Sequence, residues 1–86
     1  MMQIYAFTFT LAQMVEDEAA IDEFYGRTGD VTVVDSEGHT ELQFDREAAS
    51  LEEALGTAWR DVQATGWQVE AVSVEPQSIA LAAAGR

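Results

Sequence analysis

The chain has 86 residues, a formal net charge of -12 and no cysteine. A chain of this length forms one domain around one core, and the lack of cysteine excludes disulfides, thiolate catalysis and cysteine metal sites. Apolar residues make up 48% of the chain and fall in periodic runs, which predicts a globular fold. No apolar run reaches the roughly 20 residues of a membrane span, and the first residues lack a basic leader, so we expect a cytoplasmic protein.

The first half of the chain shows strand, helix and hairpin patterns in turn. In QIYAFTFTL, residues 3–11, large apolar side chains alternate with small or polar ones, which is the two-residue period of a strand. The segment VEDEAAIDEFYG, residues 15–26, has apolar residues at helical spacing and ends at a glycine, which predicts a short helix. Residues 31–45 predict a hairpin with Gly38 at its turn.

Residues 50–66 carry the most specific helix signal. Ser50 followed three residues later by Glu53 is a capping box, in which hydroxyl and carboxylate each accept a hydrogen bond from a backbone N–H. One apolar stripe follows, and we expect its tryptophan in the core; the stripe comprises Leu51, Ala54, Leu55, Ala58, Trp59 and Val62. For Trp67, which opens the next segment, the pattern does not decide between core and surface. Residues 67–76, WQVEAVSVEP, predict a last strand that ends at the single proline.

The predicted order is therefore βαββαβ, which belongs to the α+β class. Because strand, helix, strand crossovers are right-handed, this order most simply folds as a ferredoxin-like sandwich. We expect an antiparallel sheet in the order 4, 1, 3, 2, with two helices on one face and the other face open. Residues 1–76 would form the single α/β domain, and residues 77–86 a tail that is a helical stub or disordered.

No motif brings catalytic or metal-binding residues together. His39 is the single histidine, whereas a metal site needs three or four converging ligands. The segment YGRTGD has two glycines but lacks the remainder of a phosphate-binding loop. Four arginines among sixteen acids make no basic face for nucleic acid. We therefore expect no enzyme activity, with no catalytic residues, no cofactor, no metal, and no direct contact with nucleic acid or membrane.

The run FDREAASLEEALGTAWRDVQATGWQVEAVSVEP, residues 44–76, resembles part of a group of small bacterial proteins. In that group an N-terminal α/β domain is followed by a helix-turn-helix segment that binds DNA. The resemblance rests on the FDREA sequence, the capped helix and the Val-Glu-Pro exit from the last strand. It implies the α/β domain alone, because only QSIALAAAGR follows where the helix-turn-helix would stand. It implies no catalytic residues.

Five acids cluster in the first helical segment: Glu16, Asp17, Glu18, Asp22 and Glu23. Three explanations are open. The acids favour solubility and suit a helix N-terminus. A chain without lysine and with many acids is also typical of adaptation to high salt. The third explanation is a binding surface that resembles the phosphates of nucleic acid.

These patterns predict a non-enzymatic, acidic protein-interaction module. Its partner would be a basic, nucleic-acid-handling protein whose surface it occludes, as an antitoxin or a phage-type inhibitor of a defence complex does, with the five clustered acids as the contact. The chain is also expected to form a homodimer through the sheet face that carries Ile4, Ala6, Thr8 and Thr10. The alternative is the dimerising or sensory domain of a transcriptional regulator that lacks its DNA-binding segment.

Overall fold

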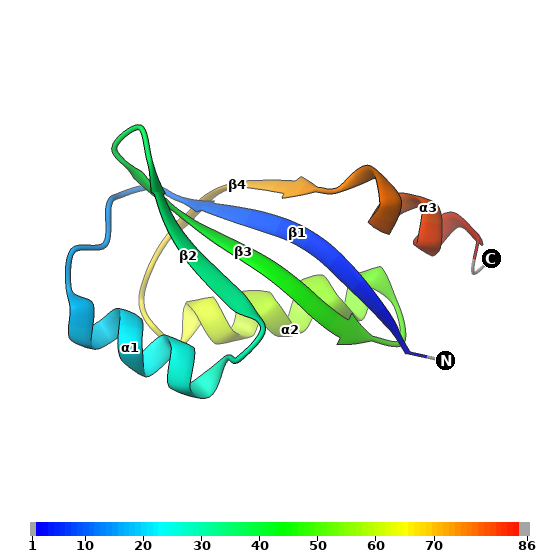
Figure 1. Cartoon of the computed structure of the whole chain (residues 1–86), viewed down its shortest axis with the longest axis horizontal. Helices are drawn as coiled ribbons and strands as arrows, with labels where there is room; N and C mark the ends of the chain where they lie inside the picture. Colours follow the sequence, from blue (N-terminus) through cyan, green and yellow to red (C-terminus); the bar gives the residue numbers. More distant parts are fainter. Residues whose placement is uncertain (1, 85–86) are drawn as a thin grey trace.

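The computed structural model describes residues 2–84, which form a four-stranded sheet and three helices in the order βαββαβα (Figure 1). The elements are β1 (Gln3–Leu11), α1 (Glu18–Arg27), β2 (Val31–Ser36), β3 (His39–Ala48), α2 (Leu51–Gln63), β4 (Val69–Val74) and α3 (Pro76–Ala84). Of the helices in this part of the chain, none has the length and apolar character that crossing a bilayer requires.

The sheet is antiparallel throughout, in the order β2-β3-β1-β4. This is the predicted order read from the opposite edge, so the α+β class and the strand arrangement are confirmed. The prediction of a ferredoxin-like sandwich was too narrow, because α3 follows β4 and the βαββαβα topology is not strictly ferredoxin-like. Pro76 ends the strand segment as expected, but it also opens α3, since its fixed φ suits the first position of a helix.

The core lies between the sheet and the helices α1 and α2, which cover the same face of the sheet (Figure 1). β1 supplies every second residue to it, namely Tyr5, Phe7, Phe9 and Leu11, as the two-residue period predicts. The rings of Phe7 and Phe44 stack at 5.2 Å between centroids, and Phe24 of α1 meets Phe44 edge-on at 6.5 Å. The apolar faces of strands and helices therefore close on one aromatic cluster.

The turns and caps show why these elements begin and end where they do. Glu37 and Gly38 connect β2 to β3 with φ values of 49° and 82°, the conformation of a two-residue hairpin turn. Ser50 caps α2, because its Oγ accepts from the N–H of Glu53 at 3.1 Å. The carboxylate of Glu53 reaches one residue further back than an ideal capping box and accepts from the N–H of Ala49 at 3.0 Å.

The first helix is shorter at its start than predicted. It begins at Glu18, because Asp17 is the N-cap and its carboxylate accepts from the N–H groups of Ala19 and Ala20 at 3.0 and 3.2 Å. Val15 stays in the preceding loop, where its N–H donates to the buried Oγ1 of Thr40 at 2.8 Å. The helix also runs through Gly26 and ends at Arg27. The start of the helix is therefore set by the Asp17 side-chain cap and not by the spacing of its apolar residues.

The prediction that Trp59 lies in the core is wrong. Trp59 is 44% exposed, whereas Ala54, Ala58 and Val62 on the same helix are fully buried. The buried stripe of α2 is thus made of small residues, which let the helix approach the sheet closely. The indole lies at the edge of that stripe and contacts Phe9 edge-on, at 6.2 Å between ring centroids. Trp67 is the more buried of the two tryptophans and packs on Phe24 at 5.2 Å.

The third helix is attached to the sheet by a side-chain hydrogen bond. Ser78 is fully buried, and its Oγ accepts from the N–H of Ala6 at 2.7 Å. The ladder between β1 and β4 begins at the pair Phe7 and Val74, so the N–H of Ala6 has no β4 residue opposite it. The Oγ of Ser78 accepts this hydrogen bond in place of a strand carbonyl. The apolar side chain of Leu81 packs against the core beside the start of α2.

Candidate functional site

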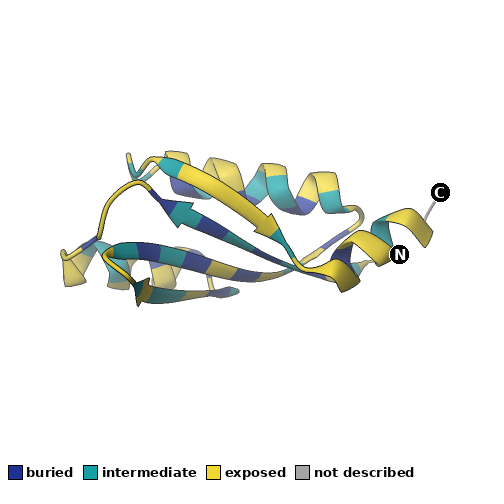
Figure 2. Cartoon of the chain, turned by 90° about the horizontal axis from the view of Figure 1, so that it is seen from above, coloured by how far each residue is buried: buried dark blue, intermediate teal, exposed yellow. Residues whose placement is uncertain are grey.

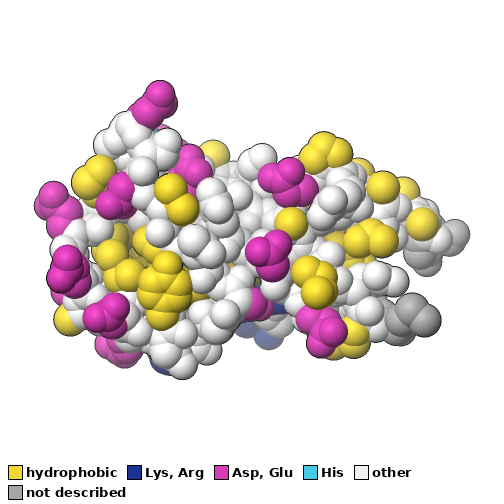
Figure 3. Space-filling model, in the orientation of Figure 1, with side chains coloured by type: hydrophobic (Ala, Val, Ile, Leu, Met, Phe, Trp, Pro, Cys, Tyr) yellow, Lys and Arg dark blue, Asp and Glu magenta, His cyan; other side chains and the backbone are white. Residues whose placement is uncertain are grey.

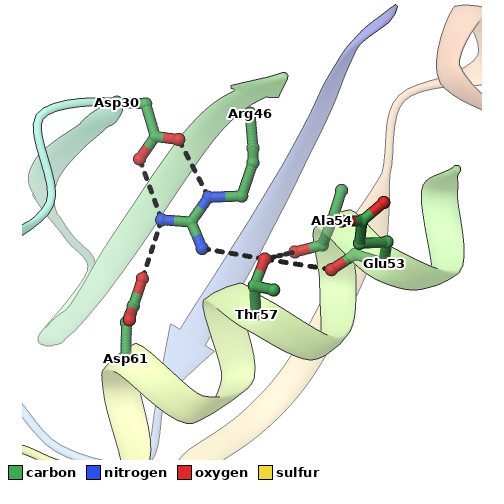
Figure 4. Close-up of polar contacts among 6 residues, drawn as sticks. All are labelled: Asp30, Arg46, Glu53, Ala54, Thr57 and Asp61. Carbon is green, nitrogen blue, oxygen red and sulfur yellow. Dashed lines mark hydrogen bonds and ion pairs between the residues drawn. The ribbon is translucent and has the colours of Figure 1, made fainter. Parts of the chain in front are cut away.

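Among the described residues, the guanidinium of Arg46 has the densest set of polar contacts (Figure 4). Its Nε and Nη2 donate to the two carboxylate oxygens of Asp30 at 2.8 and 3.0 Å. Nη1 donates to Oγ1 of Thr57 at 3.1 Å, and Nη2 also lies 2.8 Å from Oδ2 of Asp61. The Arg46 side chain is only 11% exposed. These residues, Asp30, Arg46, Thr57 and Asp61, form the arginine network.

The arginine network is a structural tie rather than a reactive group. It links β3 to the residue before β2 and to α2, so it fixes the helix against the strand hairpin (Figure 4). The hydrogen bond with Asp30 raises the pKa of Arg46, although burial opposes this effect. Because the planar donors already engage two carboxylates and a hydroxyl, the guanidinium has little capacity left to bind an anionic ligand.

The five acids predicted as a partner-binding cluster all lie exposed at α1 or at its entry. Glu16 precedes the helix, and Asp17 is its N-cap, so the carboxylate of Asp17 is engaged by backbone N–H groups. Glu18 and Asp22 are four residues apart and share one side of the helix, and Glu23 lies beside them. The structure therefore gathers the cluster on one helix, with Asp17 acting as a cap.

A second row of acids lies on the open face of the sheet. Leu42 and Phe44 of β3 point into the core, so the alternating residues Glu41, Asp45 and Glu47 point to the opposite face. Residues two apart on a strand are separated by about 6.6 Å, which spaces Asp45 and Glu47 regularly along β3. We call Glu41, Asp45 and Glu47 the β3 acid row.

Most of this negative charge has no positive partner within residues 2–84. Arg46 forms ion pairs with two of the sixteen acids, Asp30 and Asp61, and Glu70 lies 3.9 Å from the imidazole of His39, which leaves thirteen acids without a basic neighbour at this range in the described part of the chain. Figure 3 shows acids gathered over α1 and over the tip of the β2–β3 hairpin on the face it displays. The unpaired negative charge therefore lies at the surface. The nearly buried guanidinium of Arg46 is neutralised by Asp30 and Asp61.

The described residues hold no cluster of three or more histidine, cysteine or carboxylate side chains that could bind a metal ion. His39 is half exposed, and its Nδ1 lies 3.9 Å from Oε2 of Glu70. The groove lined by Glu23, Phe24, Arg27 and Trp67 has a volume of about 180 Å³, below the roughly 300 Å³ at which small-molecule sites begin.

Sequence reasoning located the acids but missed the arginine network. A signal for it was present, because Arg46 follows Leu42 and Phe44 at the two-residue period and must therefore face inward. An inward arginine needs partners, since an unpaired buried charge is strongly unfavourable. The identity of those partners depends on the packing of α2 against β3, which no local pattern encodes.

No protein-family model, no curated protein and no solved structure matches this chain. The resemblance to the N-terminal domain of helix-turn-helix proteins stays a prediction.

Proposed function

We propose that this protein is a non-enzymatic interaction module that binds a basic protein partner through its acidic surface. The observation that carries the proposal is the excess of exposed carboxylates without ion-pair partners in residues 2–84. A partner that handles nucleic acid presents a basic face with the complementary charge. Occluding that face would inhibit the partner, as an antitoxin or an anti-defence inhibitor does, and such an encounter would take place in the cytoplasm.

The α1 acids support this proposal because Glu18, Asp22 and Glu23 project from a rigid helix whose inner side is anchored by the buried Phe24. The backbone positions that carry these side chains are therefore fixed relative to one another. A partner that meets them does not have to order a flexible loop, which lowers the entropic cost of binding. Because exposed charges interact through water and salt, we expect this surface to steer and orient the partner more than to bind it tightly.

The second partner predicted from sequence is another copy of the chain. A face-to-face dimer would stack the open faces of two sheets through Ile4, Ala6, Thr8 and Thr10. In the sheet, Ile4 is paired with Glu47, Ala6 with Asp45, and Thr10 with Glu41. Stacking two such faces would bring the β3 acid rows of both copies together and remove them from water, which is unfavourable for like charges. The geometry thus favours a basic partner over this dimer.

The proposal is tested by capturing the partner from the native host with three baits. One is the wild type, the second carries Glu18→Lys with Asp22→Lys, and the third carries Glu41→Lys with Glu47→Lys. The two variants change the net charge equally but on opposite faces, so they separate a local surface from net charge. Affinity is then measured for the captured protein against salt concentration and against competing duplex DNA.

We expect the wild type to bind a basic nucleic-acid-binding protein, with DNA competing and affinity falling as salt rises. The α1 variant should bind roughly tenfold more weakly, since two exposed ion pairs of about 0.2–1 kcal/mol each turn into repulsions. The sheet variant should bind like the wild type. Equal affinity for all three baits, or no basic partner, would refute the proposal. If no partner is captured and the free energy of unfolding rises steeply with salt concentration, the acidic surface is an adaptation to high salt.

A further inference from the structure

The outer edge of β4 is the least protected part of the sheet. The sheet has two edge strands, β2 and β4. Figure 2 shows β4 as almost wholly exposed, whereas buried and half-buried residues alternate along most of β1. Edge strands present unpaired backbone groups that another strand can bind, so proteins usually cover or interrupt them.

The pairing of β1 with β4 identifies the backbone groups that face outward. The N–H of Glu75 donates to the carbonyl of Ala6 at 3.1 Å, so Glu75 faces β1. Residues alternate in this respect along an antiparallel strand, and Ser73 therefore faces β1 as well. The N–H and C=O groups of Val72 and Val74 point the other way, out of the sheet.

Two comparable positions in the sheet are closed by side chains. On β2, the N–H of Val33 donates to Oη of Tyr25 in α1 at 2.7 Å. On β1, beyond the end of β4, the N–H of Ala6 donates to Oγ of Ser78 at 2.7 Å. Within residues 2–84, no side chain bonds the outward groups of Val72 or Val74. The outward groups of Val72 and Val74 are thus open, whereas the N–H of Val33 on the other edge strand is capped.

An apolar strip lies directly beside this edge on the helix-covered face. Val72 pairs with Phe9 and shares its face, yet it is 47% exposed because α2 packs over β3 rather than over β4. The indole of Trp59 in α2 lies edge-on to the same Phe9 ring, at 6.2 Å between ring centroids. Leu55 lies one helical turn before Trp59 on α2, and with Leu81 it helps to line a groove of about 440 Å³ between α2 and α3. We call Val72, Trp59, Leu55 and Leu81 the apolar strip.

The charges around the edge indicate what can bind there. Glu70 and Glu75 flank the outward valines, and Glu52 lines the groove. A second copy of the chain would bring its own Glu70 and Glu75 next to these acids, in addition to a net charge of -12. A basic segment would meet complementary charge instead.

We propose that the β4 edge binds an extended basic segment of a partner protein, which adds a fifth strand to the sheet. The main chain of the segment pairs with Val72 and Val74, and its apolar side chains cover Val72 and Trp59. Strand addition of this kind draws affinity from backbone hydrogen bonds and specificity from alternate side chains. The inference rests on the proposed function, because it assigns the segment to the basic partner.

The test uses a synthetic peptide of about eight residues that alternates valine with lysine, and a control peptide that alternates valine with glutamine. Amide hydrogen exchange of the wild-type protein is followed by NMR with and without each peptide. The amides of Val72 and Val74 should exchange fast in the free protein and at least about tenfold more slowly with the lysine peptide. The amide of Ser73, already bonded to β1, should change little. The glutamine peptide should bind about tenfold more weakly.

Two variants separate the backbone edge from the apolar strip. Val72→Pro removes an outward N–H without breaking the ladder to β1, which edge strands tolerate, and should abolish peptide binding. Val72→Thr keeps that N–H and the strand preference, and should still bind. If Val72→Pro does not fold, Trp59→Ala serves instead, because the indole is 44% exposed and lies at the edge of the core. It should weaken peptide binding severalfold.

The proposal is overturned if the lysine peptide leaves the Val72 and Val74 amides unprotected. Peptide-induced changes confined to α1 would overturn it while leaving the proposed function intact. Equal binding of both peptides would exclude the charge selection, and protection that rises with protein concentration alone would identify a second copy as the occupant. Failure of the proposed function is read separately, from the host capture experiment with the charge variants.

Discussion

Replacing Arg46 by methionine tests whether the arginine network holds α2 to the sheet. The substitution keeps an unbranched side chain of similar length, which preserves packing on Phe44, 5.2 Å from the guanidinium carbon. It removes the contacts to Asp30, Thr57 and Asp61. Two carboxylates are then left close together without a cation.

The expected cost follows from burial. Removing one partner of a fully buried ion pair typically costs about 3–5 kcal/mol, because the other charge is left unsolvated. Here the Asp30 and Asp61 side chains are 32% and 42% exposed, so water can reach them once the arginine is gone. We therefore expect a loss of about 2–3 kcal/mol, which is a large part of the roughly 4–13 kcal/mol expected for a domain of this size. The melting temperature should fall by roughly 10 to 20 °C.

The assay is urea and thermal unfolding followed by circular dichroism. Arg46→Lys retains the charge but not the fork that binds Asp30 with two nitrogens, so its loss should be intermediate. Arg60→Met is the matched control, because Arg60 is exposed and outside the network, and it should stay within about 0.5 kcal/mol of wild type.

The raised pKa of Arg46, caused chiefly by the hydrogen bond with Asp30, sets the pH dependence. A cation with a raised folded-state pKa stabilises the fold at every pH below its unfolded-state pKa, and the contribution is lost only as pH rises through the folded value. The cost of Arg46→Met should therefore be the same at about pH 6 and pH 9. An Arg46→Met protein as stable as wild type would refute this reasoning. It would show that the free-energy cost of desolvating the arginine equals the stabilisation from all its contacts.

The remaining predictions concern two serines that each satisfy one backbone N–H. Ser50→Ala should cost about 0.5–2 kcal/mol by removing the cap of α2, and an unchanged urea midpoint would show that the cap adds nothing. Ser78→Ala should cost about 1–3 kcal/mol and speed amide exchange at Ala6, whose N–H loses its acceptor. Unchanged exchange at Ala6 would mean that another group takes over the bond.

Local patterns in the sequence were sufficient for most of the fold. The alternation in QIYAFTFTL, the turn at Gly38 and the cap at Ser50 each act within a few residues, so they can be recognised without the remainder of the chain. The strand order followed from these elements and the handedness of crossovers, because few arrangements of βαββαβ obey it. The clustering of the acids on α1 could also be read from the sequence of that one segment.

The tertiary structure alone decided which of these local features are covered. Trp59 fits the apolar stripe of α2, but the small residues beside it determine how closely the helix approaches the sheet, and that approach leaves the indole at the edge. The inward position of Arg46 can be read from the strand period, whereas its partners Asp30 and Asp61 come from other elements. The exposure of Val72 on β4 likewise arises because α2 packs over β3 rather than over β4. Local periodicity fixes the direction of a side chain, but contacts between distant elements determine what lies in front of it.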